Sequence, residues 1–230
     1  DYSKAQVLYE DIFQVMKGTP RYEDMYYKFA YSYYYQKDYS NAENLFKNFL
    51  ENFPSSNKLE EIEYMRAYSF FKESPKVDLD QTNTNKTMQL MQVFINGHPG
   101  SKRVLDATEI IDQCREKLEE KEFKAAQLYL NLGYYKAAAV AFGNVSDNFP
   151  DSKRADEYKL QVIKAYFRYA EMSYEEKQKE RFEKVITECA DFSDRYADSK
   201  HLEEVAKLKL QSTNYIKNQK NEQAKKANER

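Results

Sequence analysis

The chain of 230 residues carries 36 lysines and arginines against 38 aspartates and glutamates, which gives a formal net charge of −2. Nucleic-acid-binding domains normally show a basic stripe and a high isoelectric point, so this balance gives no reason to expect a nucleic-acid partner. No apolar run approaches the roughly 20 residues that span a bilayer. The two cysteines, Cys114 and Cys189, are too few for a disulfide framework, and we expect both to be buried free thiols.

Apolar residues at helical spacing predict α-helices along the whole chain, which glycine and proline, at five residues each, interrupt only rarely. The expected helices span residues 3–17, 21–36, 40–52, 57–73, 86–96, 102–131, 134–148, 153–172, 175–196 and 200–217. Residues 75–85 form an insertion rich in turn-forming side chains. The segment 102–131 is long for one helix, and we expect a bend or break near Lys121–Glu122. The polar tail of residues 218–230 is expected to be frayed helix or disorder.

One stretch, from Tyr39 to Ser56, recurs along the chain. Spacings of three and four residues place five of its side chains on one helical stripe: Tyr39, Ala42, Phe46, Phe49 and Phe53. Pro54 then ends the helix, and Ser56 can accept a hydrogen bond from the first free amides of the next one. The same ladder begins again at Tyr2, Thr84, Tyr135 and Phe182. Five copies in one register predict a repeat protein.

The repeated pattern resembles the tetratricopeptide repeat, a helix-turn-helix unit of about 34 residues. A small residue marks the first helix of each unit, followed three residues later by an aromatic one except at Arg168: Ala30, Ala67, Ala126 and Ala165. The resemblance implies an all-α, tetratricopeptide-like solenoid of about five units with a C-terminal covering helix. We expect a single domain over residues 1–217, with units at 1–20, 21–56, 57–101, 102–152 and 153–199 and a final helix at 200–217. The first unit lacks its first helix in this sequence, so we expect the natural protein to extend further toward the N-terminus.

Tyrosines dominate the positions that face the groove of a tetratricopeptide array, which lie three before, one after and four after the small alanine. The candidate groove residues are Tyr27, Tyr31, Tyr34, Tyr64, Tyr68, Phe71, Tyr166 and Tyr169. Tyrosine offers a wide apolar face and one hydroxyl at modest entropic cost, which suits the binding of an extended peptide. The alternative is that these rings pack against neighbouring helices as part of the core.

The sequence offers little for catalysis. Its two histidines, His98 and His201, have no partner at metal-ligand spacing. There is no glycine-rich phosphate loop and no nucleophile motif. We therefore predict neither an enzyme nor a bound metal or cofactor. His98 is expected to be a partly buried helix cap. The adjacent carboxylates Glu60 and Glu61 are expected to lie on a solvated helix face and to act as charges in the first turn of their helix.

The chain also resembles the BamD/YfiO family of outer membrane assembly lipoproteins over about residues 1–215. The matching segments are residues 38–42 through 53–56, the helix of Ala67 and Tyr68, and residues 142–152. The resemblance implies a non-catalytic scaffold at the periplasmic face of the bacterial outer membrane, held there by a lipidated N-terminal cysteine that this chain does not contain. It also implies binding to the barrel-forming assembly subunit and to unfolded barrel substrates. The alternative is a tetratricopeptide adaptor of another complex, in the cell envelope or the cytosol.

Overall fold

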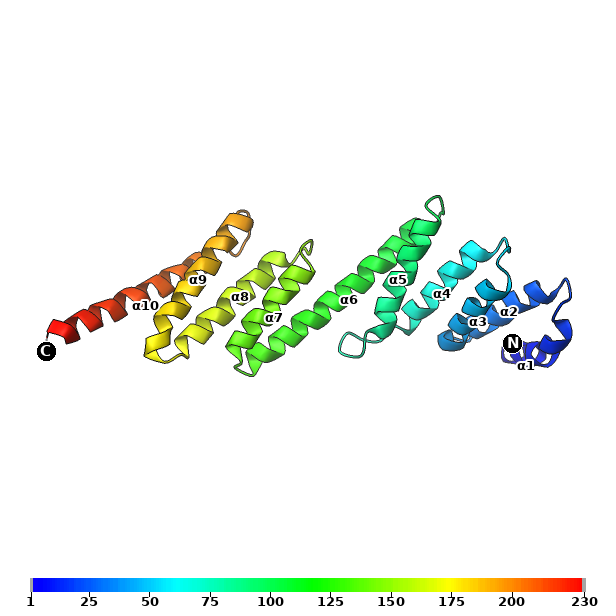
Figure 1. Ribbon diagram of the computed structural model, residues 1–230, viewed down its shortest axis with the longest axis horizontal. Coiled ribbons are helices and arrows are strands. Elements are labelled where there is room, and N and C mark those ends of the chain that lie inside the picture. Colours follow the sequence, from blue (N-terminus) through cyan, green and yellow to red (C-terminus); the bar gives the residue numbers. More distant parts are fainter. Residues whose placement is uncertain (1, 229–230) are drawn as a thin grey trace. The chain divides into compact units, whose positions relative to one another are not determined.

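Ten α-helices make up the part of the chain that the structure describes, and this part contains no strand. The computed structural model describes the backbone of residues 2–228 and the side chains of residues 2–221. In chain order the helices are α1 Tyr2–Met16, α2 Tyr22–Tyr35, α3 Tyr39–Asn52, α4 Leu59–Glu73, α5 Thr82–Gly97, α6 Val104–Asn131, α7 Tyr135–Asn148, α8 Ala155–Glu171, α9 Glu175–Arg195 and α10 Leu202–Asn228 (Figure 1). The predicted all-α, tetratricopeptide-like fold of sequential helix pairs is confirmed.

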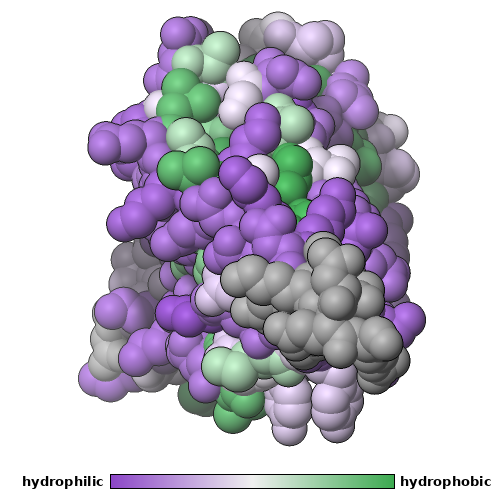
Figure 2. Space-filling model, turned by 90° about the vertical axis from the view of Figure 1, so that its left-hand side faces the viewer, coloured by the Kyte–Doolittle hydropathy of each residue, from purple (hydrophilic) through white to green (hydrophobic). Residues whose placement is uncertain are grey.

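Contacts divide the chain into two units, Asp1–Leu118 and Glu119–Arg230. In the first unit, each helix from α1 to α4 packs against the next one in sequence. The second unit repeats this arrangement from α7 to α10, and α10 also touches α8. The expected single domain over residues 1–217 stays a prediction. Hydrophilic residues cover most of the coloured surface in Figure 2, which agrees with the 32% of charged residues in the sequence.

The repeated ladder forms the core of each unit. Ala42, Phe46 and Phe49 of α3 are fully buried, and so are their counterparts in α7 and α9. The small alanine lets the paired helices approach, and the aromatic rings fill the space beyond it. The ladder of α1 is different, since none of its residues is buried.

Three expectations about helix boundaries are wrong. Helix α5 begins at Thr82 rather than residue 86, because the Asp80 carboxylate accepts the Thr82 N–H at 2.9 Å and so shortens the insertion. Helix α6 is unbroken at Lys121–Glu122. Helix α10 continues to Asn228 instead of ending at 217, because the polar tail contains strong helix formers and no glycine or proline. The last two residues, 229 and 230, lie outside the described part of the chain.

A serine follows each of four helix-ending turns and joins two consecutive repeats. Its hydroxyl accepts the N–H two residues on and donates to a carboxylate of the preceding first helix, at 2.5–2.7 Å. We call this arrangement the serine clasp; its serine–acid pairs are Ser56–Glu23, Ser101–Glu60, Ser152–Glu119 and Ser199–Asp156. The predicted capping role of Ser56 is confirmed by the Lys58 N–H, which it accepts at 3.0 Å.

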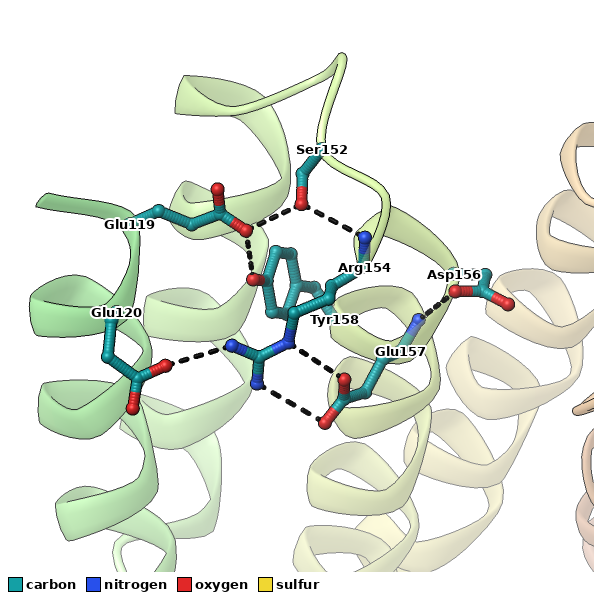
Figure 3. Close-up of polar contacts among 7 residues, drawn as sticks. All are labelled: Glu119, Glu120, Ser152, Arg154, Asp156, Glu157 and Tyr158. Carbon is teal, nitrogen blue, oxygen red and sulfur yellow. Dashed lines mark hydrogen bonds and ion pairs between the residues drawn. The ribbon is translucent and has the colours of Figure 1, made fainter. Parts of the chain in front are cut away.

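Figure 3 shows the serine clasp of the second unit. Ser152 lies between the Glu119 carboxylate and the Arg154 N–H, and the Tyr158 hydroxyl donates to the same carboxylate. The Arg154 guanidinium also pairs with Glu120 at 2.8 Å. Since Glu119 occupies the place that Glu23 has in α2, the second half of α6 acts as the first helix of a new repeat. One 28-residue helix therefore serves two repeats in succession, which accounts for the longest interval between the ladders.

Candidate functional site

Helix α2 has two aromatic faces because tyrosine or phenylalanine fills eight of its fourteen positions. One face, with Met25, Tyr26 and Phe29, is buried against α1 and α3. The opposite face presents tyrosines at helical spacing, and these are half-buried or exposed: Tyr27, Tyr31, Tyr34 and Tyr35. The candidate groove residues of this repeat therefore lie outside the core, at its margin.

The hydroxyls of Tyr27 and Tyr31 meet at a single carboxylate. Both donate to Glu61 of α4, Tyr27 at 2.9 Å. Burial and the hydrogen bond to this carboxylate raise the pKa of Tyr31 well above its ordinary value, so the phenol stays protonated and remains a donor. Glu60 and Glu61 lie in the first turn of α4, as expected, but neither simply faces solvent, because Glu60 accepts a hydrogen bond from Ser101 and Glu61 accepts the two tyrosine hydroxyls.

A row of aromatic rings continues from α2 onto α4. The ring of Tyr34 lies 6.3 Å from that of Tyr68, centroid to centroid, and Tyr68 lies 5.8 Å from Phe71. Tyr68 also stacks on Tyr64 at 5.7 Å. Tyr64 is only 7% exposed, and its hydroxyl donates to Asp106 at 3.3 Å. Tyr64 thus packs as a core residue, whereas Tyr34, Tyr68 and Phe71 remain partly accessible.

A cavity of about 340 Å³ opens beside this row in the first unit. We call it the tyrosine cavity; residues of α1, α2 and α4 line it: Tyr2, Ala5, Tyr9, Tyr27, Lys28, Tyr31, Ser32, Tyr35 and Glu61. The rings of Tyr2 and Tyr35 stack at 5.0 Å and are 50% and 53% exposed. Tyr35 lies 5.8 Å from Tyr31, so the aromatic wall is continuous from the half-buried rings to the exposed ones.

Three residues that line the tyrosine cavity are not among the groove residues that the sequence predicts: Tyr2, Tyr35 and Glu61. The sequence pattern places Tyr2 on the ladder of α1, but that ladder is not buried, and its rings line the cavity instead of a core. Tyr35 falls outside the three groove positions of the repeat. A usable signal was the run Tyr33–Tyr35, because three successive tyrosines cannot all face one core. No sequence pattern marks Glu61 as a site residue, since only the fold shows that the hydroxyls of Tyr27 and Tyr31 both donate to it.

The remaining candidates, Tyr166 and Tyr169, belong to the second unit. Tyr166 is half-buried beside the cores formed by α8 with α7 and α9. The Arg181 guanidinium lies 3.9 Å from the centre of the Tyr169 ring. Tyr169 also borders an apolar cavity of about 950 Å³ formed by residues of α6, α7 and α8, together with Tyr134 just before α7 and Met172 just after α8.

The two cysteines and His98 are the remaining residues for which the sequence predicts a role. No three or more histidines, cysteines, aspartates or glutamates lie close enough among them to hold a metal ion. The predicted burial of Cys114 and Cys189 is confirmed, and burial raises the pKa of each thiol to about 11. His98 is the half-buried C-cap of α5, as expected, and its Nε2 lies 2.7 Å from Glu63.

Sequence comparison gives a family match. The model of the family YfiO, described as outer membrane lipoprotein, matches residues 1–181. No curated protein matches the sequence. One matching solved structure is the TPR2AB domain in its pHSP90 complex, from yeast Sti1, with 13% identity over 92% of each chain and a TM-score of 0.41. Within residues 2–228, no helix is both long enough and apolar enough to cross a membrane.

Proposed function

Because the chain belongs to the YfiO family of outer membrane lipoproteins, we propose that it is a scaffold of the machinery that inserts β-barrels into the bacterial outer membrane. In this role it binds the barrel-forming assembly subunit and unfolded barrel substrates at the periplasmic face of the membrane. Membership of the family implies a non-catalytic role in outer membrane assembly.

The tyrosine cavity is the observation that supports substrate binding most strongly. An unfolded barrel segment alternates apolar and polar side chains, and its same-side residues repeat about every 6.8 Å when the segment is extended. Along α2, ring centroids follow one another at 4.7 Å from Tyr27 to Tyr31 and at 5.8 Å from Tyr31 to Tyr35. These intervals are close enough for successive apolar side chains of an extended segment to meet successive rings.

The exposed rings are the natural contact points for such a segment. Tyr2 and Tyr35 each offer about half of their surface, whereas the hydroxyls of Tyr27 and Tyr31 are already held by Glu61. The inner tyrosines therefore fix the shape of the wall, and the outer pair supplies apolar contact area. A preformed aromatic surface of this kind binds at low entropic cost.

A peptide-binding experiment tests the proposal. The probe is a short, acetylated and amidated peptide with alternating leucine and serine and one tryptophan, whose fluorescence can be excited selectively because the chain contains no tryptophan. We expect the Tyr2→Ala/Tyr35→Ala variant to bind this peptide about 30-fold more weakly than the unaltered chain, since two ring contacts worth about 1 kcal/mol each amount to about 2 kcal/mol. Circular dichroism checks that its helix content is unchanged.

Tyr174→Ala is the matched control, because Tyr174 is 89% exposed and lies in the second unit. This variant should bind the peptide as the unaltered chain does. Equal affinity in all three proteins would remove the tyrosine cavity as the substrate site. A parallel pull-down with the barrel-forming assembly subunit tests the other half of the proposal.

A further inference from the structure

We propose that the tyrosine cavity selects extended segments that present an arginine or lysine side chain, which it holds between Glu61 and the surrounding tyrosine rings. This inference rests on the proposed binding of unfolded substrates, and it adds a chemical preference to that binding. Three features of the cavity support it.

The first feature is the charge of Glu61. Its carboxylate accepts hydrogen bonds from Tyr27 and Tyr31, which are neutral donors. Among the described residues, no lysine, arginine or histidine forms an ion pair with it, although its neighbour Glu60 lies 3.8 Å from the Arg103 guanidinium. A carboxylate at a cavity wall without a basic partner favours a cationic ligand, because the charge of the ligand supplies the missing partner.

The second feature is the aromatic wall. Five tyrosines line the cavity, and rings attract cations through their negative faces. The chain already uses this interaction in the second unit, where the Arg181 guanidinium lies close over Tyr169, and at one ring of the cavity itself, where Lys58 Nζ, which also pairs with Glu23, lies 5.5 Å from the centre of the Tyr27 ring. Tyr2 and Tyr35 have half of their surface exposed and are available to a cation from outside. Aromatic rings around a carboxylate form a site suited to a cation that can stack as well as pair.

The third feature is the state of the one basic residue in the cavity. Lys28 lies at its margin, where it would repel a cationic ligand if it stood alone. Its Nζ is 2.7 Å from the Asp24 carboxylate, one turn earlier on α2. The two charges offset each other, so Glu61 remains as the uncompensated charge of the wall. An acidic side chain in the bound segment would meet that charge and be rejected.

Three matched peptides test the preference. Each is the alternating leucine and serine peptide with its tryptophan, and the central residue is arginine, glutamine or glutamate. The unaltered chain should bind the arginine peptide about tenfold more tightly than the glutamine peptide, from one charge-assisted contact and one cation–ring contact. The glutamate peptide should bind most weakly. The arginine advantage should also shrink as the salt concentration rises.

Glu61→Gln locates the source of the preference. The glutamine side chain keeps an acceptor oxygen for the two tyrosine hydroxyls, so this variant should fold. It should lose most of the arginine preference and keep only the small part that the cation–ring contact supplies. The control is Glu51→Gln, which removes a carboxylate of the same unit that lies on an exposed face of α3 and pairs loosely with Lys47 at 3.9 Å. It should keep the arginine preference.

The outcomes separate this inference from the proposed function. If the unaltered chain binds the arginine and glutamine peptides with equal affinity, the cation preference is overturned and the proposed substrate binding stands. A tenfold preference that persists in Glu61→Gln would overturn the role of Glu61. If none of the peptides binds, the proposed function fails and the preference fails with it. Should Glu61→Gln not fold, the peptide comparison on the unaltered chain still decides.

Discussion

The Tyr27 hydroxyl of α2 donates a hydrogen bond to the Glu61 carboxylate of α4 at 2.9 Å, so that the tyrosine-bearing first helices of two consecutive repeats are joined at the face proposed to bind substrate. Tyr31 donates to the same carboxylate. Tyr27, Tyr31 and Glu61 therefore both line the tyrosine cavity and hold α2 against α4.

Removal of the Tyr31 hydroxyl should destabilise the first unit. Tyr31→Phe leaves the ring in place but deprives Glu61 of a donor, and we expect the free energy of unfolding to fall by about 1 kcal/mol. Tyr33→Phe is the control, since the Tyr33 hydroxyl bonds to Glu10 on an exposed surface and should matter by less than about 0.5 kcal/mol. Urea unfolding measures both. Equal effects would show that the convergence on Glu61 adds nothing.

The small residue of the ladder should tolerate no enlargement. Ala42 is fully buried where α3 meets its neighbours, so Ala42→Leu should overpack the helix pair and cost about 1 to 3 kcal/mol. Ala206→Leu places the same change on an exposed position of α10 and should be nearly neutral. Thermal unfolding of the two variants gives the comparison. A neutral Ala42→Leu would contradict the packing role of the ladder alanine.

The buried Lys159 should link the stability of the second unit to pH. Burial acts to lower the pKa of Lys159, but its bonds to Asp191 and Glu188 outweigh this and raise the pKa. For Glu188, burial acts to raise the pKa, yet the bonds from Lys159 and Lys184 lower it. The pKa of Asp191 is also lowered, first by its hydrogen bond to Lys159. The two carboxylates therefore stabilise the fold above their unfolded pKa values of about 4.5 and 3.8, and this contribution is lost as the pH falls through the lower folded values.

Lys159→Met should thus cost about 3 kcal/mol at neutral pH, because it leaves a buried carboxylate with one partner fewer. Its stability should also fall less steeply on acidification than that of the unaltered chain. Lys28→Met, which breaks an exposed pair with Asp24, should leave both the stability and its pH dependence unchanged, because water screens an exposed ion pair. Urea unfolding at neutral and acidic pH measures both. An unchanged pH dependence in Lys159→Met would be evidence against the linkage.

The turn after α2 contains a strained residue that glycine should relieve. Lys37 has a φ of 64°, and Gly133 occupies the corresponding turn after α6 with a φ of 79°. Both N–H groups bond to a carbonyl three residues earlier, at 2.9 and 3.0 Å. Lys37→Gly should therefore stabilise the chain by about 0.5 to 1 kcal/mol, and Gly133→Ala should destabilise it by about 1 kcal/mol. Opposite signs in thermal unfolding would support this assignment, and a destabilised Lys37→Gly would refute it.

The repeat architecture was predictable because a helical ladder leaves a strong periodic signal. The ladder of Ala42, Phe46 and Phe49 recurs at one spacing, and a serine that accepts a free amide follows four of the ladders. The length of residues 102–131 favoured a break within this segment, although the segment contains neither glycine nor proline. That one continuous helix, α6, serves two repeats is visible only in the fold. The last helix extends past the expected end at residue 217 because the lysines and alanines of the polar segment favour helix even without apolar side chains.

The candidate site was predictable only in part. Tyr27, Tyr31 and Tyr34 were found from their register relative to Ala30, which fixes the face of α2 on which they lie. Whether such a ring is open or packed depends on its neighbours: Tyr64 is buried, whereas Tyr35 is exposed. That difference is set by contacts between helices far apart in sequence, so no local pattern encodes it.

Crosslinking from a single side chain tests the binding of unfolded barrel segments at the tyrosine cavity most directly. A photoreactive phenylalanine analogue replaces Tyr35 in one protein and Tyr174 in another, and each is irradiated with an extended barrel-strand peptide. We predict a covalent adduct from position 35, at the cavity, and none above background from position 174. Adducts of equal yield at both positions, or from position 174 alone, would contradict the account.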